Sequence, residues 1–99
     1  MSKVVLVTHG KLADGILSAA QLIVGEQSDV KTFGVELGCD LEKLKKGITD
    51  LLEEYSKENE FVVIMTDIFY GTPFNIITSL MESYDFIHIT GINLGIVLE

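Results

Sequence analysis

The stretch VVLVTHG, residues 4–10, decides the fold of this chain. Residues 4–7 are all apolar, which is typical of a strand covered on both faces of a parallel sheet. His9 and Gly10 follow at once, and a helical pattern begins shortly after them. The stretch therefore places an ionisable imidazole at the carboxyl end of a buried strand.

The rest of the chain repeats this alternation of strand and helix. Residues 61–65 and 85–89 form further strand-like runs, and residues 30–35 form a weaker one. Between the runs, apolar residues spaced three and four apart predict helices. The helical positions are Leu12, Ile16, Ala19, Ala20 and Ile23 before Gly25; Leu41, Leu44, Ile48, Leu51, Leu52 and Tyr55 after Asp40 as N-cap; and Phe74, Ile77, Leu80 and Met81 after Thr72 and Pro73.

The order β-α-β-α-β-α-β predicts one α/β domain over residues 1–99. We expect a doubly wound parallel sheet with helices on both faces and right-handed crossovers. In such a sheet, binding and catalytic groups lie beyond the carboxyl ends of the strands.

The composition argues against several classes of function and location. The formal net charge of −8 argues against a nucleic-acid binder and against docking on anionic lipid. The single cysteine, Cys39, excludes an internal disulfide and fits a reducing compartment. The N-terminus lacks the apolar region of a signal peptide, and no apolar run approaches the roughly 20 residues of a membrane span. We therefore expect a cytoplasmic protein without a membrane-inserted segment.

Asp67 is the candidate partner of His9. It follows the strand at residues 61–65, so it stands at the carboxyl end of a strand, as His9 does. If the two strands are neighbours, both side chains emerge at one edge of the sheet. Imidazole has an ordinary pKa of about 6.5, so neutral histidine is available as a nucleophile near neutral pH. A carboxylate bound to one ring nitrogen would fix the tautomer, leave the other nitrogen to attack, and stabilise the resulting imidazolium.

The segment GTPFN, residues 71–75, adds a candidate anion site. Gly71 would let the backbone turn, Thr72 would cap the following helix and offer a hydroxyl, and the helix N-terminus would present amides to an anion. Imidazole, carboxylate and amides together indicate acceptance of a phosphoryl group. We expect phosphate contacts from Gly10, Gly71, Thr72, Phe74 and Asn75, with no metal and no cofactor.

These features also have purely structural interpretations. A single histidine after a strand is usually a loop residue, an aspartate there often forms a turn, and Thr-Pro is a good helix start. Cys39 follows the strand at residues 30–35 and lies near the same edge, but no cationic residue flanks it, which favours an idle thiol. His88 lies within a strand and is interpreted as structural, and with His9 it lacks the spacing of a zinc site. Neither GxGxxG nor GxxxxGK[ST] occurs, so dinucleotide and P-loop chemistry are not indicated.

Two motifs in combination resemble a known family. The segment VTHGKLADGILSAAQLIVGE, together with TDIFYGTPFN, resembles the mannose-type IIA domain of the bacterial phosphoenolpyruvate-dependent sugar phosphotransferase system. GINLGIVLE resembles the segment that follows the fourth strand in that family. The likeness covers essentially the whole chain, with a departure at Tyr70-Gly71, where family members often have two glycines.

The resemblance implies a fold and a mechanism. The family's strand order, 2-1-3-4, would place the first and third strands side by side. The family histidine, here His9, takes a phosphoryl group from the phosphocarrier HPr and passes it to the IIB component, which implies a phosphotransferase with a phosphohistidine intermediate. The family's orienting aspartate corresponds to Asp67, and the Ser/Thr of its Pro-Phe-Asn motif corresponds to Thr72.

The resemblance also implies further elements after Glu99. In the family a helix and an antiparallel strand follow, and that strand is commonly exchanged between the chains of a dimer. A chain that lacks them is either a natural short form or a fragment. The strand at residues 85–89 would then be a sheet edge, and a helix beginning near Leu94 would leave apolar residues uncovered, so we expect a homodimer.

Two other functions stay open on the sequence alone. The phosphotransfer subunit of a dihydroxyacetone kinase shares the fold and a similar histidine segment, although the Pro-Phe-Asn triplet favours the sugar system. The chain could instead be a non-catalytic regulatory or dimerisation module that retains the motif residues.

Overall fold

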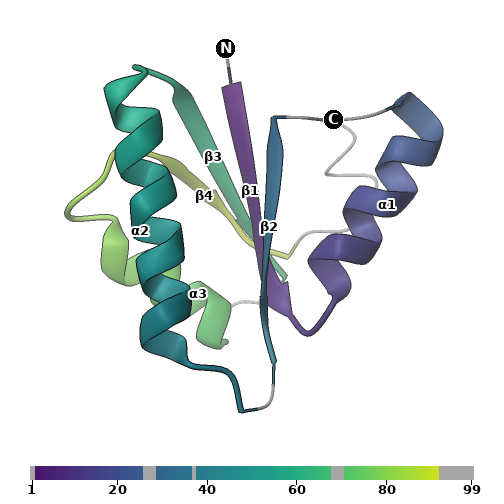
Figure 1. The fold of residues 1–99 in the computed structure, drawn as a ribbon, viewed down its shortest axis with the longest axis horizontal. Helices are drawn as coiled ribbons and strands as arrows, with labels where there is room; N and C mark the ends of the chain where they lie inside the picture. The colour runs from purple at the N-terminus through teal and green to yellow at the C-terminus, as the bar shows by residue number, and fades with distance from the viewer. Residues whose placement is uncertain (1, 26–28, 37, 68–70, 92–99) are drawn as a thin grey trace.

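The computed structural model describes residues 2–25, 29–36, 38–67 and 71–91. Strands and helices alternate in the expected order (Figure 1). The elements are β1 (Ser2–His9), α1 (Leu12–Val24), β2 (Val30–Val35), α2 (Leu41–Lys57), β3 (Phe61–Thr66), α3 (Thr72–Leu80) and β4 (Ile87–Ile89).

The strands form one parallel sheet in the order β2-β1-β3-β4. The expected strand order is confirmed, and β1 lies between β2 and β3. His9 is in register with Val35 on one side, and Val7 is in register with Thr66 on the other. The carboxyl ends of β1, β2 and β3 therefore meet at one edge of the sheet, which we call the carboxyl edge, and His9 lies there.

Helices cover both faces of this sheet. α1 lies on one face, and α2 and α3 lie on the other (Figure 1). The apolar strand β1 contributes side chains to the hydrophobic core on both faces of the sheet, because successive side chains of a strand point to opposite faces. On the α1 face, Leu6 packs with Ala13 and Ile16. The larger cluster, on the α2 and α3 face, contains Val5, Val7, Ile48, Leu52, Tyr55, Val62, Ile64, Ile77 and Leu80.

α1 packs on the sheet through a narrower stripe than its sequence suggests. Ala13, Ile16 and Ala20 are buried, whereas Leu12 and Ile23, both expected in the stripe, are 45% and 62% exposed. These two residues lie in the first and last turns, and the helix slants away from β2 toward its C-terminal end (Figure 1). α1 therefore packs on the strands mainly through Ala13, Ile16 and Ala20.

α2 begins and packs as expected except at its first residue. The Asp40 side chain is the N-cap and accepts hydrogen bonds from the amides of Glu42, at 3.1 Å, and Lys43, at 3.2 Å. Ile48 is fully buried further along the helix, but Leu41 is 45% exposed. Because Leu41 lies in the first turn, near the carboxyl edge, it borders the site described below.

The end of the described chain differs from expectation in one respect. β4 begins at Ile87 and not at Asp85, because its ladder with β3 starts at the pair Val63 and Ile87. Tyr70 and the helix expected near Leu94 lie outside the described residues. Within those residues, no helix has the length and apolar character needed to cross a membrane.

Candidate functional site

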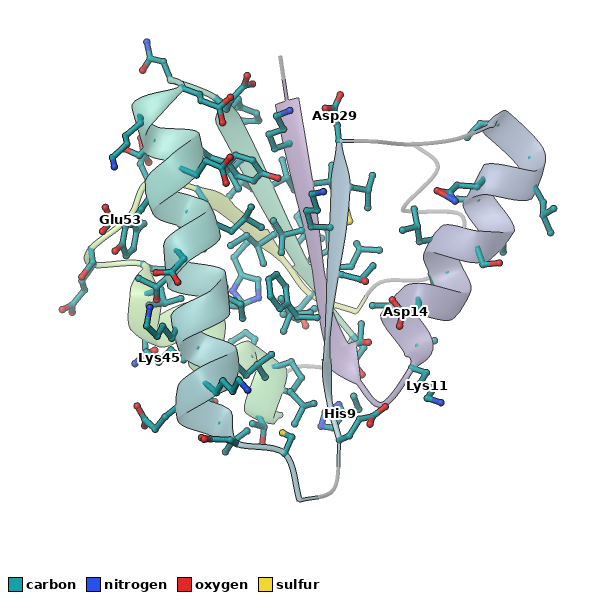
Figure 2. The ribbon with its side chains drawn as sticks, viewed as in Figure 1. His9, Lys11, Asp14, Asp29, Lys45 and Glu53 are labelled. Atoms are coloured by element: carbon teal, nitrogen blue, oxygen red, sulfur yellow. The ribbon has the colours of Figure 1, made fainter. Side chains whose placement is uncertain are left out.

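His9 and Asp67 meet at the carboxyl edge of the sheet, where Figure 2 shows His9 beside the turn into α1. Ring atom Nδ1 of His9 lies 2.9 Å from Oδ2 of Asp67, and the backbone N–H of His9 donates to the same oxygen at 3.1 Å. A carboxylate accepts hydrogen bonds but cannot donate them, so Nδ1 carries a hydrogen, and in the neutral ring Nε2 keeps its lone pair. The arrangement leaves Nε2 as the nucleophilic atom.

The two partners differ in burial and in charge. The His9 side chain is 46% exposed, whereas the Asp67 side chain is 9% exposed. Burial by itself raises the pKa of Asp67, but hydrogen bonds from the His9 amide, the His9 ring and its own amide together lower it by more. The net pKa of Asp67 therefore lies below its ordinary value. At neutral pH a buried, ionised carboxylate holds an accessible imidazole.

The turn that carries His9 is fixed by Thr8 and Gly10. Thr8 is fully buried, and its Oγ1 accepts a hydrogen bond of 2.8 Å from the amide of Ala13 in the first turn of α1. Gly10 has a φ of 55°, in the left-handed region that favours glycine, and its N–H donates to the carbonyl of Val35 at 2.8 Å. The sequence did not reveal the role of Thr8, because its bond spans a turn and lacks the spacing of a helix cap.

The start of α3 corrects two expectations about the GTPFN segment. Gly71 is the N-cap, and Thr72 is the first helical residue, whose side chain makes no capping hydrogen bond. Gly71 itself has φ −86° and ψ 177°, an extended conformation that any residue adopts, so no turn there requires glycine. Pro73 lies in the first turn, as expected. The Thr72 hydroxyl is thus not engaged in capping its own helix.

Thr72 and His9 line one groove at the carboxyl edge. Cys39, expected near this edge, lies in the same groove as a free and half-buried thiol. The groove has a volume of about 350 Å³ and is lined by His9, Val35, Glu36, Gly38, Cys39, Leu41 and Thr72.

Two other residues expected to contact phosphate, Asn75 and Phe74, have contacts different from those of Thr72. Asn75 lines an adjoining groove with Thr72, and its amide donates to the carbonyl of Gly71 at 2.9 Å. The ring of Phe74 packs against His88, with ring centroids 5.1 Å apart. Thr72 therefore lines both grooves, and it shares the first of them with His9.

His88 has structural contacts on β4. Its Nε2 lies 3.0 Å from Oγ1 of Thr66, the fully buried residue that precedes Asp67, and burial lowers the pKa of His88. Because His88 also packs against Phe74, it links the end of β3 to the first turn of α3. No group of three or more His, Cys, Asp or Glu side chains among the described residues could hold a metal ion.

Comparison with known proteins identifies the family. The family model EIIA-man, described as the PTS system fructose IIA component, matches residues 3–99. The PTS system fructose-specific EIIA component of Bacillus subtilis (strain 168) is 28% identical over 100 residues, which cover 100% of this chain and 68% of that protein.

Solved structures agree with this match. Phosphotransferase system component EIIA from Streptococcus agalactiae has a TM-score of 0.90 and 28% identity, with 100% of this chain and 75% of that chain covered. The mannose/sorbose specific IIA subunit of the phosphotransferase system from Enterococcus faecalis has a TM-score of 0.87 and 27% identity, with 99% and 74% covered. The chain belongs to the mannose-type IIA family of the sugar phosphotransferase system.

Proposed function

We propose that His9 accepts a phosphoryl group on Nε2 from phosphorylated HPr and passes it to a IIB component during sugar uptake. The observation that carries this proposal is the half-exposed imidazole whose Nδ1 is bound, at 2.9 Å, to a carboxylate that is 9% exposed. Membership of the IIA family supports transfer of a phosphoryl group within the sugar phosphotransferase system.

The geometry supports a direct displacement at phosphorus. The lone pair of Nε2 forms the new N–P bond while the bond from phosphorus to the donor atom breaks, and that electron pair stays with the donor. The His9 ring becomes a cation, because Nδ1 keeps its hydrogen. Asp67 offsets this positive charge and holds the ring in place, which is the role of the buried carboxylate in other histidine-based sites. Transfer to the acceptor reverses these steps.

Thr72 is the second group that we assign to the reaction. Its hydroxyl is not used as a helix cap, and it lines the groove that contains His9. The N-terminus of α3 also carries the positive end of the helix dipole, which favours an anion. We propose that Thr72 contacts the oxygens of the phosphoryl group, with Gly10, Gly71, Phe74 and Asn75 as the further expected contacts.

A reconstituted reaction tests this function. The protein is mixed with phosphoenolpyruvate, enzyme I and HPr, and its mass is measured before and after mild acid treatment. We expect a gain of one phosphoryl group that acid removes, followed by its loss when a IIB component is added. A protein that gains no phosphoryl group would instead be a non-catalytic module that retains the family residues.

We further propose that the protein acts in the cytoplasm as a homodimer. Among the described residues, β4 pairs only with β3, and the apolar side chains of Ile87 and Ile89 are 47% and 37% exposed. Such an edge recruits another chain. Sedimentation equilibrium should show a dimer for the parent and a weaker one for Ile87→Lys. Identical monomers at high concentration would rule out this interface.

A further inference from the structure

β2 approaches the turn that carries His9 at a point where no side chain fits. Gly34 of β2 is in register with Thr8 of β1, and the following pair is Val35 with His9. A Cβ atom added to Gly34 would overlap the backbone carbonyl oxygen of Gly10. Because the contact is between two backbone segments, no change of rotamer can relieve it. A glycine within a strand is a recognised sign of such a close approach.

The same turn is held from both sides by hydrogen bonds. On the β2 side, the N–H of Gly10 donates to the carbonyl of Val35 at 2.8 Å. On the β3 side, the N–H and the ring of His9 both bind Oδ2 of Asp67, at 3.1 Å and 2.9 Å. The position of His9 relative to Asp67 therefore depends on how closely the neighbouring Gly10 packs against β2.

We propose that Gly34 is a positioning residue for the phosphorylation of His9, an inference that rests on the proposed function. By leaving room for the Gly10 carbonyl, Gly34 sets the position of the His9 backbone and keeps Nδ1 within hydrogen-bond distance of Asp67. A methyl group at Gly34 displaces the Gly10 carbonyl and the His9 peptide with it. The ring then loses its fixed tautomer, and Nε2 loses its alignment with the incoming phosphorus.

Gly34→Ala tests this role against a matched glycine. Gly15 lies in the first turn of α1, and a Cβ atom there meets no atom within 4 Å. The measurements are single-turnover phosphorylation at increasing concentrations of phosphorylated HPr, and nitrogen NMR of the histidine rings. For Gly34→Ala we expect the saturating rate to fall by about 10-fold to 100-fold, the effect of an ångström-scale misplacement. The half-saturating concentration should stay the same, and the His9 ring should show a mixture of tautomers. Gly15→Ala should match the parent in both measurements.

Two more variants separate positioning from general loss of stability. Ile48→Val removes a methylene group from the fully buried core beneath α2, and it should lower the melting temperature while leaving the rate and the His9 tautomer as in the parent. Gly10→Ala disturbs the same contact from the other side, because a left-handed φ is strained for alanine. It should reproduce the slow rate and the mixed tautomer of Gly34→Ala.

The outcomes are distinct. A Gly34→Ala protein with the parent's rate and a single His9 tautomer would overturn the proposal. A Gly34→Ala protein that is unfolded by circular dichroism would also overturn it, because Gly34 would then be needed for folding and not for positioning. If the parent itself takes no phosphoryl group, the proposed function is wrong, and the tautomers of the parent and Gly34→Ala still decide whether Gly34 positions the His9 ring.

Discussion

Two carboxylates at opposite edges of the sheet each hold a basic side chain at nearly the same distance, yet only one pair is suited to chemistry. Figure 2 labels Asp29 of one pair and His9 of the other. At the edge where the strands begin, which we call the amino edge, Nζ of Lys3 lies 2.8 Å from Asp29. At the carboxyl edge, Nδ1 of His9 lies 2.9 Å from Asp67. Lys3 carries a positive charge and no lone pair, and its hydrogen bond to Asp29 raises the pKa of Lys3 further. His9 uses one nitrogen in the pair and keeps a lone pair on the other.

The two pairs also differ in which partner faces solvent. The Lys3 side chain is 19% exposed and Asp29 is 35% exposed, whereas His9 is 46% exposed and Asp67 is 9% exposed. At the amino edge the acid is therefore the more accessible group, and at the carboxyl edge the base is. A short distance between an acid and a base is therefore a weak indication of function. An accessible base that is bound to a buried acid is a stronger one.

The largest expected effect comes from removing the base at each edge in turn. His9→Gln should keep the fold, because the side chain is nearly half exposed, and it should abolish acid-labile phosphorylation. Lys3→Gln removes the base at the amino edge and should be phosphorylated at the parent's rate. The mass gain after incubation with phosphoenolpyruvate, enzyme I and HPr measures both. Undiminished phosphorylation of His9→Gln would contradict the assignment of His9 as the residue that accepts the phosphoryl group.

Removing the charge of each carboxylate gives the next largest effect. Asp67→Asn keeps the size of the side chain but can hold the wrong ring tautomer, so the single-turnover rate should fall by up to about 10⁴-fold, the loss seen for the analogous carboxylate in a Ser-His-Asp site. Asp29→Asn should leave the rate unchanged. If Asp67→Asn transfers phosphate at the parent's rate, Asp67 is only a structural residue of the loop.

Thr72 should give a smaller effect on the rate. Thr72→Val removes the hydroxyl, and we expect transfer to be about 10-fold to 100-fold slower, typical of losing one hydrogen bond to a charged group. Removal of an N-cap side chain lowers the free energy of unfolding by about 0.5–2 kcal/mol. Because Thr72 does not cap α3, urea denaturation of Thr72→Val should show no such decrease. Thr72→Ser should behave as the parent. A slow Thr72→Ser protein would show that the methyl group, and hence packing, matters.

The smallest expected effect concerns stability and pH. Burial lowers the pKa of His88 in the folded protein, so below about pH 6.5 the unfolded chain takes up a proton that the folded one does not. The free energy of unfolding should therefore fall as the pH drops from about 7.5 through the ordinary histidine pKa of about 6.5.

Urea denaturation of two histidine variants across this pH range tests whether His88 causes the fall in the free energy of unfolding. The chain has 2 histidines. In His88→Gln the free energy of unfolding should no longer fall over this pH range, whereas in His9→Gln it should fall as in the parent. The pKa of Asp67 is also lowered, but its contribution is lost only as the pH drops through the acid range below about 3.9. A fall that persists unchanged in His88→Gln would contradict the assignment to His88.

The sequence predicts most of this architecture because two periodicities dominate it. The apolar run in β1 and the helical spacing in α2 gave the alternation of elements, and parallel strands then bring His9 and Asp67 to one edge. The residues that the pattern wrongly predicts as buried lie at the ends of helices. Leu12 and Leu41 fit the helical spacing, but each stands in a first turn where the sheet no longer covers it.

The parts of the site that escaped prediction include one contact between segments distant in sequence and two local features. The packing of the Gly10 carbonyl on Gly34 exists only once β2 is placed beside β1. The bond from the Ala13 amide to Thr8 is local, but it spans the turn between β1 and α1 and lacks the spacing of a helix cap. Local sequence predicts Thr72 as the cap, but α3 begins at Thr72 and its N-cap is Gly71. Local patterns cannot separate two adjacent candidates for the same cap.

The atom that carries phosphate tests the account most directly. Because Asp67 binds Nδ1 of His9, the account predicts that phosphorylation occurs on Nε2, with the hydrogen retained on Nδ1. Nitrogen and phosphorus NMR of the isotope-labelled, phosphorylated protein distinguish the two ring positions. A phosphoryl group on Nε2 of His9 is the predicted result; one on Nδ1 of His9, or on any other residue, would contradict the account.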